Sequence, residues 1–138
     1  MALELIVVTP EGQAFHGDVE GVVLPGSEGE FEVLAGHEAF LSGLHIGEMQ
    51  IHRAGETLHA AVSRGFAEVH DDKLSVMVGT CEFATEIDRE RAELARERAQ
   101  RQLDEMRHTP EGAATYQEYQ DAYSRAIARI AVSDRFKV

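Results

Sequence analysis

The sequence has little cysteine and no long apolar run. Cys81 is the one cysteine among 138 residues, so an internal disulfide is excluded and a reducing compartment is favoured. No activating base can be named beside Cys81, and we expect it to be a small buried hydrophobe rather than a nucleophile. No apolar run approaches the roughly 20 residues of a membrane helix, and the first residues, with Glu4 and no basic cluster, lack the pattern of a signal peptide. We therefore predict one compact protein that is connected to a membrane only through a partner.

Basic residues are scarce in the first part of the chain. Residues 1–84 hold three lysines and arginines against fourteen aspartates and glutamates, whereas residues 85–138 hold ten against eleven. The net charge of −12 argues against direct binding to nucleic acid or to anionic lipid. The uneven distribution indicates two segments with different surfaces and different partners.

Motifs of catalysis are also missing. The sequence has no G-x-S-x-G elbow, no Ser-His-Asp spacing and no Gly-rich phosphate loop of the Walker type. A cupin-like metalloenzyme is one alternative, but the closely spaced His-x-His pair typical of such sites is absent. We predict no catalytic residue and no metal site, and hence a protein that acts by binding. The histidines on which a cupin-like enzyme would depend are His37, His45, His52, His59 and His70.

Residues 1–84 have the pattern of an antiparallel β-sandwich. Short apolar or alternating segments recur about every ten residues, and each is closed by Gly, Pro or Asp. Residues 53–56 and 70–73 are predicted hairpin turns, because Asp and Gly tolerate the positive φ of tight turns. The predicted strands lie within residues 3–10, 21–26, 31–36, 49–55, 58–65, 66–72 and 73–79.

Residues 85–138 have the pattern of an antiparallel α-helical hairpin, which makes the whole chain an α+β protein. The first helix is predicted over residues 87–107, with Thr85 and Asp88 as a capping pair. Pro110 ends it and suits the first turn of a second helix over residues 111–132, with Thr109 as its N-cap. The expected apolar stripe of the first helix is Ile87, Leu94, Ala95, Ala99, Leu103 and Met106, and that of the second is Tyr116, Tyr119, Tyr123, Ile127 and Ile130. Alanine and tyrosine dominate both stripes, so we expect a loosely packed hairpin that is able to come apart.

Two arginines fall on the apolar side of the predicted first helix. Arg91 and Arg98 are seven residues apart and share this side, whereas Arg89 and Arg96 point to the opposite, solvated side. Their stems could cover alanine while the guanidinium groups reach water. Alternatively, the two planar forks could form an anion site, since arginine donates paired hydrogen bonds to phosphate. Without a Walker loop, such a site would not hydrolyse its ligand.

Three segments in this order resemble the epsilon subunit of bacterial F-type ATP synthase, and the resemblance covers essentially the whole chain. Residues 22–47 are similar to the family's "GSEGE" turn and "GH" loop. Residues 63–78 are similar to its glycine–phenylalanine strand and the hairpin near the end of the sandwich. "EIDRERA" at residues 86–92 matches the I/L-D-x-x-R-A pattern with which family members bind ATP.

The resemblance implies a rotor subunit without a catalytic role, peripheral at the cytoplasmic face of the bacterial inner membrane. The sandwich, residues 1–84, would bind the gamma subunit and the c-ring. The hairpin, residues 85–138, would permit ATP hydrolysis when folded down on the sandwich. Extended along gamma to the catalytic alpha and beta subunits, it would block hydrolysis, and a regulatory ATP would favour the folded state. A stand-alone nucleotide-sensing module without a rotor partner is the other alternative.

The resemblance also assigns residues to these roles. Arg125 and Arg129 lie opposite the tyrosine stripe on a helical wheel, so a solvated basic face is an equal reading of both. With Arg135 and Lys137 they would also suit acidic segments of the catalytic subunits in the extended state. The implied ATP-binding residues are Glu82, Ile87, Asp88, Arg91, Ala92, Arg98, Arg125 and Arg129.

The implied contacts with the c-ring and gamma are Glu30 and His37, although His37 would also fit an ordinary loop histidine. Three positions depart from the family pattern in segments expected to be loops at the ring contact. Glu32 stands in place of a usual glycine, and Ala39 and Phe40 stand in place of a common proline and leucine.

Overall fold

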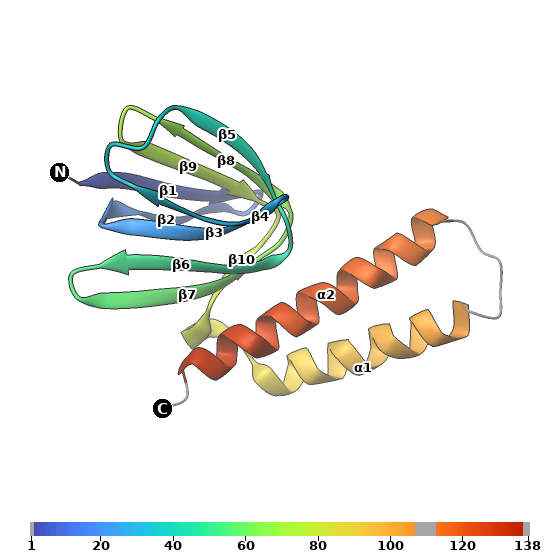
Figure 1. The fold of residues 1–138 in the computed structure, drawn as a ribbon. Coiled ribbons are helices and arrows are strands. Elements are labelled where there is room, and N and C mark those ends of the chain that lie inside the picture. The colour runs from blue at the N-terminus through green and yellow to red at the C-terminus, as the bar shows by residue number, and fades with distance from the viewer. Residues whose placement is uncertain (1, 107–112, 137–138) are drawn as a thin grey trace.

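The computed structural model of the chain describes residues 2–106 and 113–136. Over these residues it shows a β-sandwich followed by two helices that lie side by side (Figure 1). The strands are β1 Leu3–Thr9, β2 Gly12–Val19, β3 Gly21–Gly26, β4 Gly29–Leu34, β5 Phe40–Leu44, β6 Gly47–Arg53, β7 Glu56–Val62, β8 Gly65–His70, β9 Lys73–Val78 and β10 Cys81–Phe83. The helical elements are the 3₁₀ turn η1 Ala84–Glu86 and the helices α1 Arg89–Met106 and α2 Ala113–Phe136. The predicted sandwich and helical hairpin are thereby confirmed.

The strands form one hydrogen-bonded path that folds back on itself into the sandwich. Their order is β10-β7-β6-β3-β5-β8-β9-β1-β2, and β4 pairs with β3 beside this path. Neighbouring strands along the path are antiparallel, as predicted, except that β1 pairs with β9 in parallel. Both predicted hairpin turns are confirmed. Asp71 and Asp72 (φ 47° and 58°) join β8 to β9, and Ala54 and Gly55 (φ 44° and 78°) join β6 to β7.

The core of the sandwich is made by alternate strand residues. In β1, Leu3, Leu5 and Val7 are fully buried, and the residues between them lie nearer to solvent. Each such side chain contributes about 1.5–3 kcal/mol to folding. Within the described residues, the buried apolar cluster of the sandwich consists of strand residues alone. The sandwich therefore has a complete core of its own and does not need the helices to bury it.

The first helix begins later than predicted. α1 starts one residue after Asp88, whose Oδ1 accepts a hydrogen bond from the backbone N–H of Arg91 at 3.1 Å. Asp88 is therefore the N-cap itself. The predicted pairing of Thr85 with Asp88 is wrong, because Thr85 lies in η1 and Ile87 is extended (φ −78°, ψ 124°). The predicted end of the helix at Arg107 lies outside the described residues.

The buried side of α1 differs from the predicted stripe. Its buried side chains are Ala92, Ala99 and Leu103. Leu94, expected among them, is 54% exposed, and Arg91 and Arg98 are also exposed. The placement of these two arginines on the apolar side is therefore wrong. The helical wheel was anchored on Ile87, which precedes the helix, and two of the three buried side chains of α1 are small alanines rather than large apolar residues.

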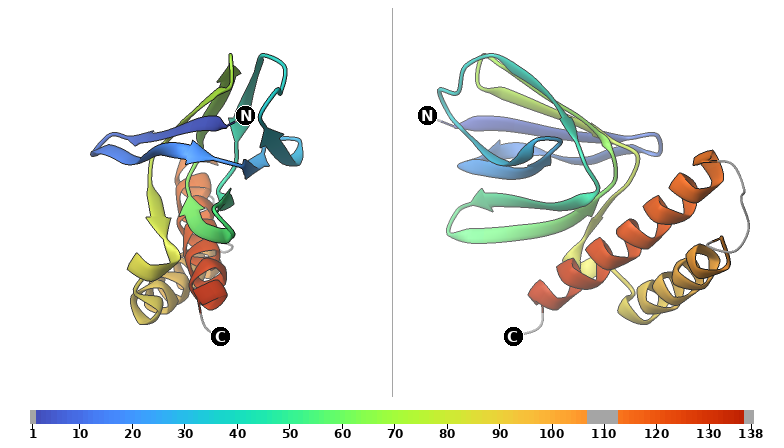
Figure 2. Two further views of the ribbon diagram at one scale, coloured as in Figure 1. Left: turned by 90° about the vertical axis from the view of Figure 1, so that its left-hand side faces the viewer. Right: turned by 45° about the vertical axis from the view of Figure 1, so that its right-hand side comes forward.

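α2 lies between the sandwich and α1, as Figure 1 and the right-hand view of Figure 2 show. The second helix, predicted over residues 111–132, is observed over residues 113–136, and Thr109 and Pro110 lie outside the described residues. The tyrosine stripe is not the buried side, since Tyr116 is 47% and Ile127 is 40% exposed. The buried side chains of α2 are Ala126, Val132 and Ser133.

One arginine of α1 links the two helices. Arg89, which the sequence placed on the solvated side, forms ion pairs with Glu93 of α1 and with Asp134 of α2. The placement of Arg89 on the solvated side is therefore also wrong, because the side of α1 that faces α2 is the one that contains Ala92. The hairpin is thus held by small apolar side chains and by a charged contact near its open end.

Candidate functional site

The seam between α2 and the sandwich combines ion pairs with small apolar side chains such as Ala61 and Ala128. α2 lies against β6, β7 and η1, and it meets the strand side chains that point away from the core. Among residues 2–106 and 113–136, three arginine–carboxylate ion pairs cross the seam: Arg64 with Asp121 at 2.8 Å, Arg129 with Glu82 at 3.0 Å and Arg135 with Glu48 at 3.1 Å. Partly exposed ion pairs contribute little each and weaken with salt. The docking of the hairpin on the sandwich is therefore sensitive to charge.

A cavity opens in this seam between β7, β10 and α2. Its volume is about 190 Å³, and it is lined by Ala61, Val62, Thr80, Glu82, Arg125, Ala128 and Arg129. The short strand β10 brings Glu82 opposite Ala61 of β7. Across the cavity, Arg129 Nε lies 3.0 Å from Glu82 Oε1, and Nη2 donates to Oε2 at 3.3 Å. Arg125 is exposed beside this pair and supplies a second guanidinium.

The ion pair at the N-terminal half of α2 holds its carboxylate in the charged form. Burial acts to raise the pKa of Asp121, but hydrogen bonds from Arg64 and Gln117, both at 2.8 Å, lower that pKa below its usual range. Asp121 therefore stays ionised at neutral pH. Arg64 comes from the connection between β7 and β8, so this contact ties a turn of the sandwich to the helix.

Cys81 lies next to the cavity and is chemically quiet. Its side chain is half-buried, and burial, together with Glu86 and Glu82, raises the pKa of its thiol to about 12. Thiolate is the reactive form, so the thiol is protected at neutral pH. Within residues 2–106 and 113–136, no group of three or more His, Cys, Asp or Glu side chains is arranged to hold a metal ion.

An exposed apolar row crosses four neighbouring strands on the outside of the sandwich. Phe66 of β8 lies opposite Met77 of β9, which lies opposite Val8 of β1, and Leu41 lies nearby on β5. These four side chains, which we call the outer apolar row, are 57%, 46%, 37% and 66% exposed, respectively. Contiguous exposed apolar surface of this kind marks contact sites for other proteins. This row was not predicted from the sequence, because Phe66 and Met77 occupy outward positions of their strands, where alternation predicts polar residues.

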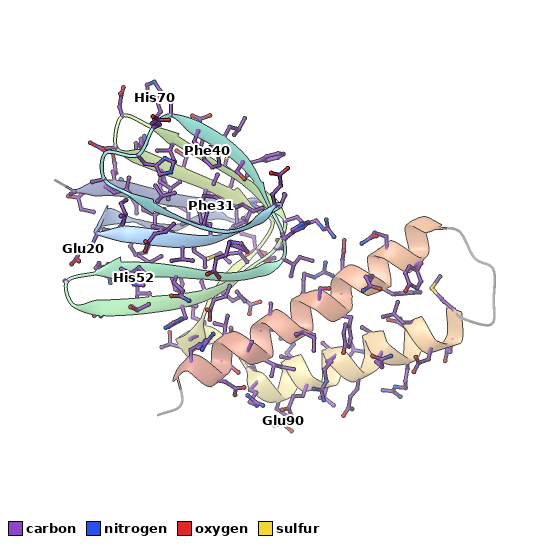
Figure 3. All side chains as sticks on the ribbon, viewed as in Figure 1. Glu20, Phe31, Phe40, His52, His70 and Glu90 are labelled. Carbon is purple, nitrogen blue, oxygen red and sulfur yellow. The ribbon has the colours of Figure 1, made fainter. Side chains whose placement is uncertain are left out.

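The residues expected at the c-ring and gamma lie at another part of the sandwich. Glu30 is exposed on β4, and His37 lies between β4 and β5, where its Nδ1 is 2.9 Å from the carbonyl oxygen of Glu38. The His37 ring is 5.7 Å from that of Phe40, which meets Phe31 edge to face at 5.4 Å. Phe31 and Phe40 lie close together on the sandwich, away from the helices (Figure 3). His37 is thus held against an aromatic pair.

Two of the positions that depart from the family pattern lie in strands. Glu32 is part of β4 and Phe40 opens β5, so their assignment to loops is wrong. Glu32 is exposed, with Oε2 at 4.0 Å from Nε2 of His52. Ala39 lies in the connection before β5 and is exposed.

Two family models match the chain in the same order as its parts. Residues 2–84 match the β-sandwich domain of the ATP synthase delta/epsilon chain, and residues 85–134 match the long α-helix domain of that chain. The chain belongs to the ATP synthase delta/epsilon family. An ATP synthase epsilon chain of Syntrophobacter fumaroxidans is 42% identical over 134 residues, which cover 96% of this chain and 96% of the relative. Epsilon chains of Nitratidesulfovibrio vulgaris (40% identical, 95% of each chain covered) and Geobacter metallireducens (39% identical, 96% of this chain and 94% of the relative) are similar over nearly their whole lengths.

Solved structures share the fold. A chain of the Euglena gracilis mitochondrial ATP synthase, in an assembly of OSCP, F1 and c-ring, superposes with a TM-score of 0.79 at 22% identity and covers 94% of this chain and 80% of that chain. A chain of the Tetrahymena thermophila mitochondrial ATP synthase central stalk and c-ring gives a TM-score of 0.54 at 18% identity, over 62% and 69% of the two chains. Among the described residues of this family member, neither helix is apolar enough over a sufficient length to cross a membrane.

The fold of this delta/epsilon chain brings together some of the residues that the resemblance assigns to ATP. Glu82, Arg125 and Arg129 line the seam cavity. Asp88 and Arg91 are exposed at the start of α1, Ala92 is fully buried, Ile87 is half-buried just before the helix, and Arg98 is exposed two turns further along. The helical wheel placed Arg129 on the solvated side. That placement is wrong, because α2 turns this arginine toward β10.

Proposed function

We propose that this chain is a central-stalk subunit of a proton-translocating F-type ATP synthase, at the cytoplasmic face of the bacterial inner membrane. In this proposal the sandwich binds gamma and the c-ring and transmits rotation between them. The helical hairpin is mobile and, when extended toward the catalytic alpha and beta subunits, inhibits ATP hydrolysis. The chain itself supplies no catalytic group. The observation that carries the proposal is family membership along both parts of the chain.

The surface of the sandwich supports the proposed partners. The outer apolar row is a contact surface for a protein rather than for water. The Glu30 and His37 region lies beside Phe40, the residue before Leu41 of this row, and offers a second contact surface. The strongly negative net charge of residues 1–84 opposes direct binding of the sandwich to anionic lipid.

The seam supports a mobile hairpin. The sandwich has a core of its own, so undocking α2 exposes little of it. The three ion pairs that cross the seam exchange for water at small cost, because their carboxylates and arginines are already partly hydrated. The hairpin is thus a body whose docked and undocked states differ by a small free energy, and this is the property that a switch requires.

A regulatory ATP would bind where the seam arginines gather. The cavity of about 190 Å³ is smaller than the roughly 300–1,000 Å³ of most ligand pockets. A nucleotide would therefore be only partly enclosed, with Glu82 toward the base and Arg125 and Arg129 toward the phosphates. Arg91 and Arg98, exposed on α1, would reach the phosphates from outside. ATP would favour the docked hairpin by the difference in its affinity for the two states.

A locked hairpin tests the inhibitory role. Cysteines in place of Ala61 and Ala128, which line the same cavity, would be joined by oxidation or a short bis-maleimide in a Cys81→Ser background. Reconstituted with the other subunits of its F1 sector, the locked chain should lose inhibition of ATP hydrolysis, and reduction of a disulfide lock should restore it. Equal inhibition by the locked and free chains would refute a role for hairpin extension.

Calorimetry on the full-length chain tests the ATP site. Arg91→Ala and Arg98→Ala are each expected to weaken ATP binding about tenfold, since a charged hydrogen bond contributes roughly 1.5 kcal/mol. Arg101→Ala is the matched control, because Arg101 is an exposed arginine of α1 outside the proposed site. Absence of ATP binding by the wild type at millimolar nucleotide would leave the hairpin as a mechanical brake without this ligand.

A further inference from the structure

One carboxylate anchors the C-terminal end of α2 on the sandwich. Glu48 of β6 accepts a hydrogen bond from Arg135 Nε through Oε2 at 3.1 Å and another from Gln50 Nε2 through Oε1 at 3.0 Å. The Glu48 side chain is only 18% exposed. Of the three ion pairs across the seam, this one lies closest to the chain end of the hairpin, where α2 would begin to lift.

A histidine shares the same oxygen. His59 Nδ1 lies 3.4 Å from Glu48 Oε2, the atom that Arg135 also uses. His59 is on β7 opposite Gln50, and its side chain is 24% exposed. Within the described residues, its buried Nδ1 has no hydrogen-bond partner. Two potential cations therefore face one carboxylate oxygen, and of the two side-chain types imidazole is the one that can gain or lose a proton in the physiological range.

We propose that His59 is a pH sensor that weakens the docking of the hairpin when it is protonated. His59 and Glu48 both belong to the sandwich and stay neighbours whether or not α2 is docked. An imidazolium at position 59 would pair with Glu48 and repel the guanidinium of Arg135. Protonation thus favours the state in which Arg135 has left, so docking weakens as the pH falls and strengthens as it rises.

Several other charged groups on β7 and on the elements packed against it have ion-pair partners. On α2, Asp134 is paired with Arg89 and Arg129 with Glu82, which comes from β10. On β7 itself, Glu56 is paired with Arg53 of β6. Glu86 of η1, which also packs against β7, is exposed, and the groups that share an oxygen contact with His59 are Glu48 and Arg135. They line an open groove of about 440 Å³ with Ile46, Tyr123 and Ile127, which gives water and protons access to the cluster.

This inference rests on the proposed mobility of the hairpin, and one experiment tests the two separately. Donor and acceptor fluorophores would be attached to cysteines in place of Glu20 on the sandwich and Glu105 on α1, in a full-length Cys81→Ser chain. Glu20 lies at the edge of the sandwich (Figure 3), and both positions are exposed. Energy transfer between the labels reports the docked fraction at constant ionic strength.

Lowering the pH from about 7.5 to about 5.5, across the usual histidine range, should reduce the docking constant about two- to fivefold, the effect of one partly exposed ion pair. His59→Gln should dock normally at the higher pH and lose this response. Glu48→Gln should dock more weakly at both pH values and also lose it. His70→Gln is the matched control, because His70 is an exposed histidine on the side of the sandwich remote from the helices (Figure 3), and it should respond like the wild type.

The outcomes separate the two proposals. A full pH response in His59→Gln, or a loss of response in His70→Gln, overturns the sensor while leaving a mobile hairpin. A hairpin that undocks in about 1 M salt, where charge interactions are screened within about 3 Å, but ignores pH also overturns the sensor alone. A hairpin that stays docked in every variant and at every salt concentration overturns both the sensor and the mobility.

Discussion

The ion pair between Glu82 and Arg129 gives the sharpest quantitative prediction about the seam. Two nitrogen–oxygen contacts of 3.0 and 3.3 Å join the two side chains, of which Glu82 is 35% and Arg129 is 23% exposed. At 3.0 Å the bare Coulomb attraction is roughly 5 kcal/mol at an effective dielectric constant near 20. Desolvation and the ordering of two side chains cancel most of it, and we expect a net coupling of about 1–2 kcal/mol. This corresponds to a change of about 5- to 30-fold in the docking constant.

A double-mutant cycle measures this coupling. Glu82→Gln, Arg129→Gln and the double variant would be compared with the wild type by energy transfer between the labels on the sandwich and α1. The single variants should each undock the hairpin, and the double variant should undock it less than the sum of the two. Arg125 lines the same cavity and offers Glu82 a second partner, so the coupling should approach the lower end of the range. Glu90→Gln is the control, since Glu90 points to solvent from the side of α1 away from α2 (Figure 3). Strictly additive effects of the two substitutions would refute an ion pair that holds the seam.

Three further predictions concern other parts of the molecule. Phe66→Glu in the outer apolar row should abolish co-purification with a co-expressed gamma subunit without lowering the melting temperature of the chain. The control Thr57→Glu, at an exposed position on an edge of the sandwich, should leave binding to gamma intact. Retained binding in Phe66→Glu would place the gamma surface elsewhere. Ala92→Leu should destabilise the hairpin by about 1–3 kcal/mol, because Ala92 is fully buried and a larger side chain overpacks the helix contact. Amide hydrogen exchange should become faster in α1 and α2 but not in the strands. Unchanged exchange in the helices would show that the contact has room for the larger side chain. Cys81, with its pKa raised to about 12, should react slowly with thiol reagents at pH 8 until the chain unfolds. Because the unfolded thiol ionises first, near pH 8.5, its contribution to stability should be intact below about that pH and be lost as the pH rises toward 12, and a Cys81→Ser chain should lack this loss.

The strands that the sequence predicted are those whose alternation carries a buried face. β1, β3, β8 and β9 place an apolar residue inward at nearly every second position, and period-2 patterning detects such strands. β2 was missed because Val19 is its one buried residue and the inward positions before it hold the half-buried Phe15 and Gly17, so few large apolar residues mark its alternation. β5 was missed because its glycine and serine interrupt the pattern, and β10 because it is three residues long.

The helices were predicted as elements, but their faces were not. A helical wheel gives the right buried side only if the first helical residue is known. Asp88 is the N-cap of α1, and Ile87, on which the wheel was anchored, lies before the helix in extended backbone. The side of α1 against α2 is marked by alanines, which hydrophobicity patterns weigh less than the exposed Leu94. Whether such alanines are buried depends on which side of the helix a neighbouring helix contacts, and the tertiary fold determines this.

Part of the candidate site depends on the same long-range geometry. Glu82 meets Arg129 because a three-residue strand pairs with β7 and because α2 returns along the sandwich. Residues 47 positions apart are thus joined, and no local pattern predicts such a contact. The family resemblance placed Arg129 in the site where the wheel did not, since homologous residues carry tertiary information that periodicity lacks.

The parallel pairing of β1 with β9 affects how the sandwich folds while the chain is synthesised on the ribosome. The first strand to emerge finds one of its two neighbours, residues 73–77, only after most of the sandwich has been synthesised. Contacts between distant segments close slowly, so β1 and its hairpin partner β2 wait as an incomplete sheet with one bare edge. The helices, whose contacts with each other are close in sequence, emerge last and can pair quickly. The new chain therefore completes its helical hairpin soon after the last strands of the sandwich have paired.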